Sequence, residues 1–231
     1  MKLHTTTVGD GPKRAALIHG ITGNGETWFE FAPWIAEHGY TVTLVDQRGH
    51  GKSDRAESYT AADLADDLVD TLPQGLDIIM GHSLGGRSLI LAVDRLLPQK
   101  AVYLDPGWEI PADLVLELPL RPDGSLVSPD EFLELAPTRS RAHAEQALRA
   151  MAAFDARMFE PPHVPLPSIY PPDIPVVPSL VVLADPTALV LPPLQERLRA
   201  GGYTIRVVPG GQHDLHVDNL EGTKLAVEDW L

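Results

Sequence analysis

The chain has no cysteine, few basic residues and no long apolar run. Without cysteine it can form neither a disulfide framework nor a thiolate metal site. Lysine and arginine number 18 against 32 aspartates and glutamates, which gives a formal net charge of −14. Nucleic acids and anionic membranes attract clustered Lys and Arg, so this balance argues against both as partners. No apolar stretch is long enough for a signal peptide or a membrane span, so the sequence predicts a soluble cytoplasmic protein.

Short apolar segments alternate with helical patterns along most of the chain. Hydrophobic residues make up 44% of 231, enough for one sizeable core. Strand candidates, apolar on both faces and bounded by turn residues, lie at 15–18, 41–45, 76–80, 101–104, 180–183 and 204–208. Helical patterns lie at 28–37, 61–72, 84–97, 192–200 and 219–230. The alternation predicts a doubly wound α/β fold with a mostly parallel sheet, and residues 1–9 are expected to add an antiparallel edge strand.

The alternation stops between the fourth and fifth of these strands. Ser128 followed by proline and two acidic residues marks a helix start, and 141–159 carries a longer helical pattern. Residues 161–178 hold eight prolines, which excludes a regular helix or central strand. We therefore predict a small helical, proline-rich cap at 107–178 on a core formed by 1–106 and 179–231. Apolar side chains are expected to anchor its returning loop: Val164, Leu166, Ile169, Tyr170, Ile174 and Val176.

The hexapeptide at 81–86, Gly-His-Ser-Leu-Gly-Gly, is the strongest chemical signal. A buried strand is predicted before it and a helix after it. Gly-x-Ser-x-Gly in that setting is typical of the nucleophile elbow of serine hydrolases. The turn is tight, so a side chain at Gly81 or Gly85 would collide with the neighbouring strand or helix. The pattern predicts that Ser83 is a nucleophile; the plainer interpretation is an incidental serine in a glycine-rich turn.

Polar groups follow several of the predicted parallel strands. Since ligands bind outside the carboxyl ends of the strands in open α/β sheets, these groups are candidates for one site. They include Ser83, Asp105, Asp185 and His213. Their order along the chain, serine then aspartate then histidine, is that of one serine-hydrolase architecture.

These motifs together resemble the α/β-hydrolase fold family. The matching segments are His19-Gly20, the Asp-x-Arg-Gly-His-Gly-x-Ser motif at 46–53, the hexapeptide at 81–86 and Gly-Gln-His at 211–213. They cover 15–105 and 179–231 in the family's order. The resemblance implies that the backbone amides of Ile21 and Leu84 form an oxyanion hole. A glycine turn and a helix N-terminus both present unpaired N–H donors, which agrees with that role.

The base is expected to be His213. It follows a strand and a Pro-Gly-Gly turn, on a loop able to lean over the elbow. An imidazole with a pKa near 6.5 can take the serine proton and return it to a leaving group. His216, three residues later, is the nearest rival. Three further histidines, His19, His50 and His82, belong to the family motifs and are expected to support loops.

The acid has two candidates. Most family members carry it in a Gly-x-x-Asp pattern after the penultimate strand, but here that position falls on Thr187 or Ala188. Asp185 is displaced toward the strand. Asp105 follows the strand after the elbow, where branches such as haloalkane dehalogenases and zearalenone lactonases place their acid. We favour Asp105 and keep Asp185 as the alternative; either would hold the imidazole tautomer.

A serine at the elbow argues against haloalkane dehalogenase and soluble epoxide hydrolase activity, which use an elbow aspartate. The expected reaction is hydrolysis of a small carboxylic ester or lactone through an acyl-serine. The leucine, proline and valine of the cap favour an apolar substrate. No cofactor or metal is expected, no nucleotide-binding glycine fingerprint is present, and the sequence leaves the oligomeric state open. The alternatives are a slow or inert small-molecule receptor or scaffold on this fold, and a cofactor-free perhydrolase or haloperoxidase.

Overall fold

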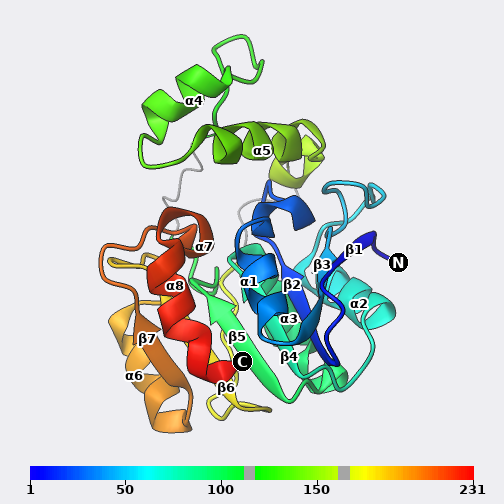
Figure 1. Cartoon of the computed structure of the whole chain (residues 1–231), viewed down its shortest axis with the longest axis vertical. Helices are drawn as coiled ribbons and strands as arrows, with labels where there is room; N and C mark the ends of the chain where they lie inside the picture. Colours follow the sequence, from blue (N-terminus) through cyan, green and yellow to red (C-terminus); the bar gives the residue numbers. More distant parts are fainter. Residues whose placement is uncertain (112–117, 161–166) are drawn as a thin grey trace.

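A seven-stranded sheet forms the centre of the computed structural model, which describes residues 1–111, 118–160 and 167–231 (Figure 1). The strand order is β1-β3-β2-β4-β5-β6-β7. Only β1 runs antiparallel, against β3, so the predicted edge strand and mostly parallel sheet are confirmed. The strands are Thr5–Val8 (β1), Lys13–Ile18 (β2), Tyr40–Val45 (β3), Ile78–His82 (β4), Lys100–Leu104 (β5), Ser179–Leu183 (β6) and Thr204–Val207 (β7).

Helices cover both faces of the sheet, as a doubly wound fold requires. On one face α2 (Ala61–Thr71), α3 (Leu84–Leu96) and α6 (Pro192–Gly201) pack through Leu68, Leu89 and Leu198. On the other, α1 (Phe31–Glu37) and α8 (Leu220–Val227) pack through side chains that include Phe31, Ile35 and Val227. Burial of both faces explains why the central strands are continuously apolar. Among the helices of the described ranges, none has the length and apolarity needed to cross a membrane.

Some helix boundaries differ from the prediction because polar side chains cap shorter turns. The first helix is divided: Asn24 caps a 3₁₀ turn, η1 (Gly25–Trp28), and α1 begins only at Phe31. The predicted helix at 141–159 ends as α5 at Ala152, and Asp155 caps a separate turn, η2 (Ala156–Phe159). The last helix is likewise α8 followed by η3 (Glu228–Trp230), and α7 (Leu215–Asp218) precedes it. Asparagine and aspartate side chains compete with the helix for backbone donors, which favours such breaks.

Two neighbouring strands end in register and so place two polar residues together. In the β4–β5 pairing, His82 lies opposite Leu104. The Ser83 amide donates to the Leu104 carbonyl at 3.1 Å, and the Asp105 amide continues the ladder to Val182 at 2.7 Å. Ser83 and Asp105 therefore leave the sheet side by side at its carboxyl edge.

Two helices of the segment between β5 and β6 lie over that edge. They are α4 (Pro129–Leu135) and α5, seen at the top of Figure 1. Ser128 caps α4 as predicted, and Glu131 returns the contact to the Ser128 amide. The two helices share a small apolar cluster built on Phe132, Ala144 and Leu148.

The returning proline-rich loop is held differently from the prediction. Of the six expected anchors, Ile169 packs against the core, whereas Tyr170, Ile174 and Val176 are exposed, so the prediction was wrong for these three. Val164 and Leu166 lie outside the described residues. Besides Ile169 and Val177, which pack against the core, polar and cation–π contacts to the α6–β7 region hold the loop. The Tyr203 hydroxyl donates to the Pro172 carbonyl at 3.1 Å, and Arg197 lies over the Tyr170 ring.

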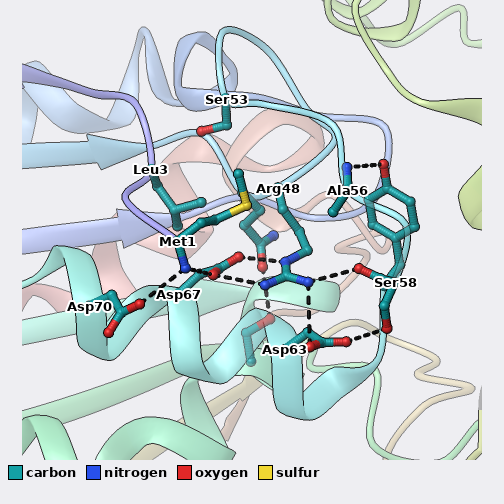
Figure 2. A network of polar contacts seen from close by, with 12 residues as sticks. Met1, Leu3, Arg48, Ser53, Ala56, Ser58, Asp63, Asp67 and Asp70 are labelled. Carbon is teal, nitrogen blue, oxygen red and sulfur yellow. Dashed lines mark hydrogen bonds and ion pairs between the residues drawn. The ribbon is translucent and has the colours of Figure 1, made fainter.

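A buried arginine ties the loop after β3 to helix α2. Arg48, 8% exposed, donates from Nε and Nη2 to the two carboxylate oxygens of Asp67, at 2.5 and 2.8 Å (Figure 2). Its Nη1 donates to the Ser58 carbonyl at 2.8 Å. This bidentate pair satisfies the charge of both partners in the interior. The arginine of the Asp-x-Arg-Gly-His-Gly motif thereby fixes this loop against α2.

Candidate active site

Ser83 occupies a strained turn between β4 and α3. Its φ of 48° and ψ of −111° are unfavourable for a residue with a side chain. The two flanking glycines make the turn possible. A Cβ on Gly81 would lie 2.5 Å from the Gly85 carbonyl oxygen, and one on Gly85 would lie 2.3 Å from that of Ile18. The predicted elbow geometry is present, with Ser83 at the start of a helix.

His213 lies within hydrogen-bond distance of Ser83. It sits on the loop after β7, and its Nε2 is 2.9 Å from Ser83 Oγ. Its Nδ1 is 2.7 Å from Asp105 Oδ2. This network assigns Nδ1 as the protonated nitrogen, so Nε2 accepts from the serine hydroxyl. Burial opposes protonation of the ring, but the hydrogen bond to Asp105 and the charges of Asp214, Asp105 and Asp218 raise the pKa of His213.

Asp105 is the aspartate that the structure places beside His213. Its side chain is buried, and its Oδ1 accepts the Ala184 amide at 3.2 Å while Oδ2 faces the imidazole. A φ of 36° turns the residue away from the strand toward the site. Asp185 is exposed and its amide donates to the Gly211 carbonyl, with no hydrogen bond between its carboxylate and His213. The geometry therefore favours the first of the two candidate acids.

Two backbone amides beside Ser83 are free to bind an anion. The amide of Leu84 is the first in α3, and that of Ile21 follows the glycine turn after β2. Neither donates a hydrogen bond to another described residue, and both residues line the cavity above the serine. Unpaired amides facing a nucleophile are the donors that stabilise a tetrahedral oxyanion.

The rival histidine has a different position. The ring of His216 stacks on Trp28 at a centroid distance of 4.0 Å, and neither of its nitrogens has a hydrogen-bond partner among the described residues. Burial holds the pKa of His216 well below its usual value, so the ring is neutral. It makes no contact with Ser83, and the structure gives no support to it as the base.

The three motif histidines have loop contacts, as expected. His19 Nδ1 donates to the Gly20 carbonyl at 2.7 Å, and His50 Nδ1 donates to that of Arg48 at 2.8 Å. His82 Nε2 lies 2.9 Å from the His213 carbonyl, so it fixes the backbone of the candidate base. Burial lowers the pKa of His19 and His82 to about 4 and that of His50 to about 3.

The sequence reasoning missed an ion-pair cluster near the site. Arg139, in the turn before α5, donates from Nη2 to Asp214 at 2.5 Å and from Nε to Asp218 at 2.9 Å. Asp214 also lies 3.5 Å from His82 Nε2. A link between the α4–α5 segment and the His213 loop thus rests on ion pairs. No sequence signal points to Arg139, since the contact spans more than 70 residues.

A cavity of about 920 Å³ lies between the sheet edge and helices α4 and α5. Ser83, Asp105 and His213 reach it from below, and Phe132 and Met151 line it from above. Within the described ranges one group of side chains has metal-ligand spacing: His82, His213 and Asp214. Its imidazole nitrogens already bond to Ser83, to Asp105 and to the His213 carbonyl. The arrangement is therefore suited to proton transfer between a hydroxyl and an imidazole.

Comparison with known proteins places the chain in a family. Residues 16–223 match the model described as the alpha/beta hydrolase family, and the chain belongs to it. Over 97 residues it is 40% identical to a 2-(acetamidomethylene)succinate hydrolase of Mesorhizobium japonicum, covering 40% of this chain and 34% of that protein. Over 160 residues it is 26% identical to a polyneuridine aldehyde esterase of Rauvolfia serpentina, covering 58% and 60%. The matches thus span about one third to three fifths of these curated relatives.

Solved structures share the fold over nearly the whole chain. An N-formylmaleamic acid deformylase from Pseudomonas putida superposes with a TM-score of 0.76 at 21% identity, covering 97% of this chain and 96% of that one. The thioesterase domain from the curacin biosynthetic pathway gives 0.71 at 19% identity, covering 97% and 93%. At these identities the likeness concerns the fold alone.

Proposed function

We propose that the chain is a serine hydrolase that cleaves a small carboxylic ester or lactone through an acyl-serine. The continuous hydrogen-bonded chain from Asp105 through His213 to Ser83 carries this proposal. Such a chain is the geometric signature of nucleophilic acyl transfer, whatever the order of its residues in the sequence.

In acylation, His213 Nε2 takes the proton of Ser83 as Oγ attacks the substrate carbonyl carbon. The tetrahedral oxyanion would lie between the amides of Ile21 and Leu84, and removing one such donor typically costs ~10²–10³ in rate. Asp105 accepts the Nδ1 proton, which keeps Nε2 free as an acceptor and stabilises the imidazolium that forms. The imidazolium of His213 then donates its Nε2 proton to the departing alkoxide.

Deacylation repeats these steps with water. His213 removes a proton from a water molecule, the resulting hydroxide attacks the acyl-serine carbonyl, and the proton returns to Ser83 Oγ. The free acid leaves and the serine is restored. No step requires a metal or an organic cofactor.

The names of relatives support hydrolysis of esters and related acyl bonds. They include esterases, a 2-(acetamidomethylene)succinate hydrolase and, at fold level, an N-acyl homoserine lactone degrading enzyme. We also propose that residues 107–178 act as a cap over the core, because α4 and α5 roof the cavity. The cytoplasmic location stays a prediction from the sequence.

The receptor alternative rested on the lack of an aspartate at the family's usual position. Asp105 reaches the imidazole from the neighbouring strand, so that reason no longer applies. A perhydrolase would use the same three side chains, and no contact in the described residues favours it over hydrolysis.

Hydrolysis of p-nitrophenyl esters of graded acyl length tests the proposal. We expect turnover that Ser83→Ala reduces to background, with the melting temperature unchanged or raised because the strained serine is relieved. Ser125→Ala, an exposed serine on the α4 side of the molecule, is the matched control and should keep wild-type rates. Full activity in Ser83→Ala would overturn the proposal.

A further inference from the structure

A second buried arginine, Arg87, lines the cavity and has no counter-ion among the described residues. Arg87 lies on α3 one turn after Ser83, with its amide donating to the Ser83 carbonyl at 3.2 Å. The residue is 2% exposed. Burying an unpaired charge is strongly unfavourable, so a fold that retains one needs a compensating interaction.

The partners of Arg87 are neutral carbonyl groups. Its Nη1 donates to Gly107 at 2.5 Å and its Nη2 to Pro167 at 2.7 Å. Its Nε has no hydrogen-bond partner among the described residues. A guanidinium has five N–H donors, and these two hydrogen bonds use only two of them. No carboxylate of the described chain forms an ion pair with it.

The other arginines of the interior and the cavity are neutralised. Arg48 is paired bidentately with Asp67 (Figure 2). Arg139 also lines the cavity, but Asp214 and Asp218 both contact it. Burial lowers the pKa of Arg87 to about 10, which still leaves it cationic at neutral pH. The cavity therefore contains one cation whose charge no described side chain balances.

We infer that Arg87 binds a carboxylate in the acyl part of the substrate. The inference rests on the hydrolase function proposed above and narrows its substrate to half-esters of dicarboxylic acids or their close analogues. One helical turn, about 5.4 Å, separates Arg87 from Ser83 along α3, a span that a short methylene chain covers. A carboxylate there would complete the guanidinium with charge-assisted hydrogen bonds. This substrate class differs from the apolar substrate expected from the sequence.

The net charge of the protein works against such a ligand. A molecule with a formal charge of −14 repels anions at long range. A preference for an anionic ester over its neutral counterpart must therefore arise inside the cavity. Such a preference would directly report a cationic binding group there.

The test compares monomethyl adipate with dimethyl adipate, which share the acyl chain and the leaving group. For the wild type we expect kcat/KM at least about tenfold higher for the anion, because only the anion forms a charge-assisted hydrogen bond with Arg87. Arg87→Met should reduce this ratio to about one or below, and Arg87→Lys should retain part of it. Arg95→Met, an exposed arginine at the far end of the same helix, is the matched control and should leave the ratio unchanged.

Binding of adipate to Ser83→Ala separates this inference from the proposed function. We expect adipate to bind Ser83→Ala in calorimetry and to bind Ser83→Ala/Arg87→Met at least about tenfold more weakly. Arg87-dependent binding without hydrolysis of any ester would support the anion site and overturn the hydrolase. Equal wild-type rates for the two esters would overturn the anion site and leave the hydrolase standing, even if Arg87→Met failed to fold.

Discussion

At the scale of single residues, the position of one carboxylate decides how the site is assembled. Asp105 leaves the sheet directly after β5, with a φ of 36°, and reaches Nδ1 of His213 at 2.7 Å. Asp185 begins a similar turn one strand away, but its carboxylate stays exposed. Both aspartates precede proline and follow a strand, so the sequence favours Asp105 only through the family resemblance. The register and the backbone direction separate the two clearly.

Replacing the two aspartates tests this assignment. Asp105→Asn should leave the protein folded but lower kcat by up to ~10⁴, because an amide can select the wrong imidazole tautomer and cannot stabilise the imidazolium. Asp185→Asn should cost little beyond a small loss of turn stability. Steady-state kinetics and thermal melts of both variants measure these effects. The reverse ranking would assign the acid to the family's usual loop.

At the scale of secondary-structure elements, the parallel strands were predictable to within about two residues, and the helix breaks were not. The strand before the elbow, for example, was expected at 76–80 and lies at Ile78–His82. The apolar runs of β4 and β5 are long enough to identify a buried parallel sheet, and that sheet alone brings Ser83 and Asp105 to one edge. The contacts of Arg139 and the exposed side chains of the proline-rich loop depend on how α4, α5 and α6 pack. Such long-range packing leaves no periodic trace in the sequence.

A carboxylate at the N-cap of the short helix α7 acts on the candidate base. Asp214, next to His213 and paired with Arg139, helps to raise the pKa of His213. A protonated base cannot accept the serine proton, so activity should fall as pH drops through this raised pKa. In Asp214→Asn the imidazolium loses a stabilising charge, so the acid limb of kcat/KM should move to lower pH.

The matched control for this shift is Glu221→Gln. Glu221 is an exposed residue of α8 whose carboxylate forms an ion pair with Lys224. The pH profile of kcat/KM for Glu221→Gln should coincide with that of the wild type. An acid limb that stays fixed or moves to higher pH in Asp214→Asn would contradict the role given to this charge.

At the scale of the whole molecule, the buried histidines govern the response to acid. Burial lowers the pKa of His19 and His82 to about 4 and of His50 to about 3, and His216 lies well below its usual value. These four imidazole rings are neutral in the folded protein, whereas in the unfolded chain they protonate near pH 6.5. The unfolded chain therefore binds more protons as the pH falls, so the free energy of unfolding falls with it. The raised pKa of His213 has the opposite effect on the free energy of unfolding, but it is one histidine against the four with lowered pKa values.

Denaturant melts between pH 7.5 and 4 test this account. We expect the free energy of unfolding to decrease steadily from about pH 6.5 toward 4. His216→Phe keeps the stack on Trp28 and removes one titrating ring, so its decrease should be shallower than that of the wild type. A wild-type stability that stays flat over this range would contradict the neutral burial of these histidines.

The most direct test of the central claim is covalent labelling with a serine-reactive phosphonate, followed by mass spectrometry of the peptides. We predict one adduct per chain, on Ser83, and no adduct in Ser83→Ala. In His213→Gln the labelling rate should fall by about three orders of magnitude, because the serine loses its base. An adduct on another serine, or an unchanged rate in His213→Gln, would contradict the account.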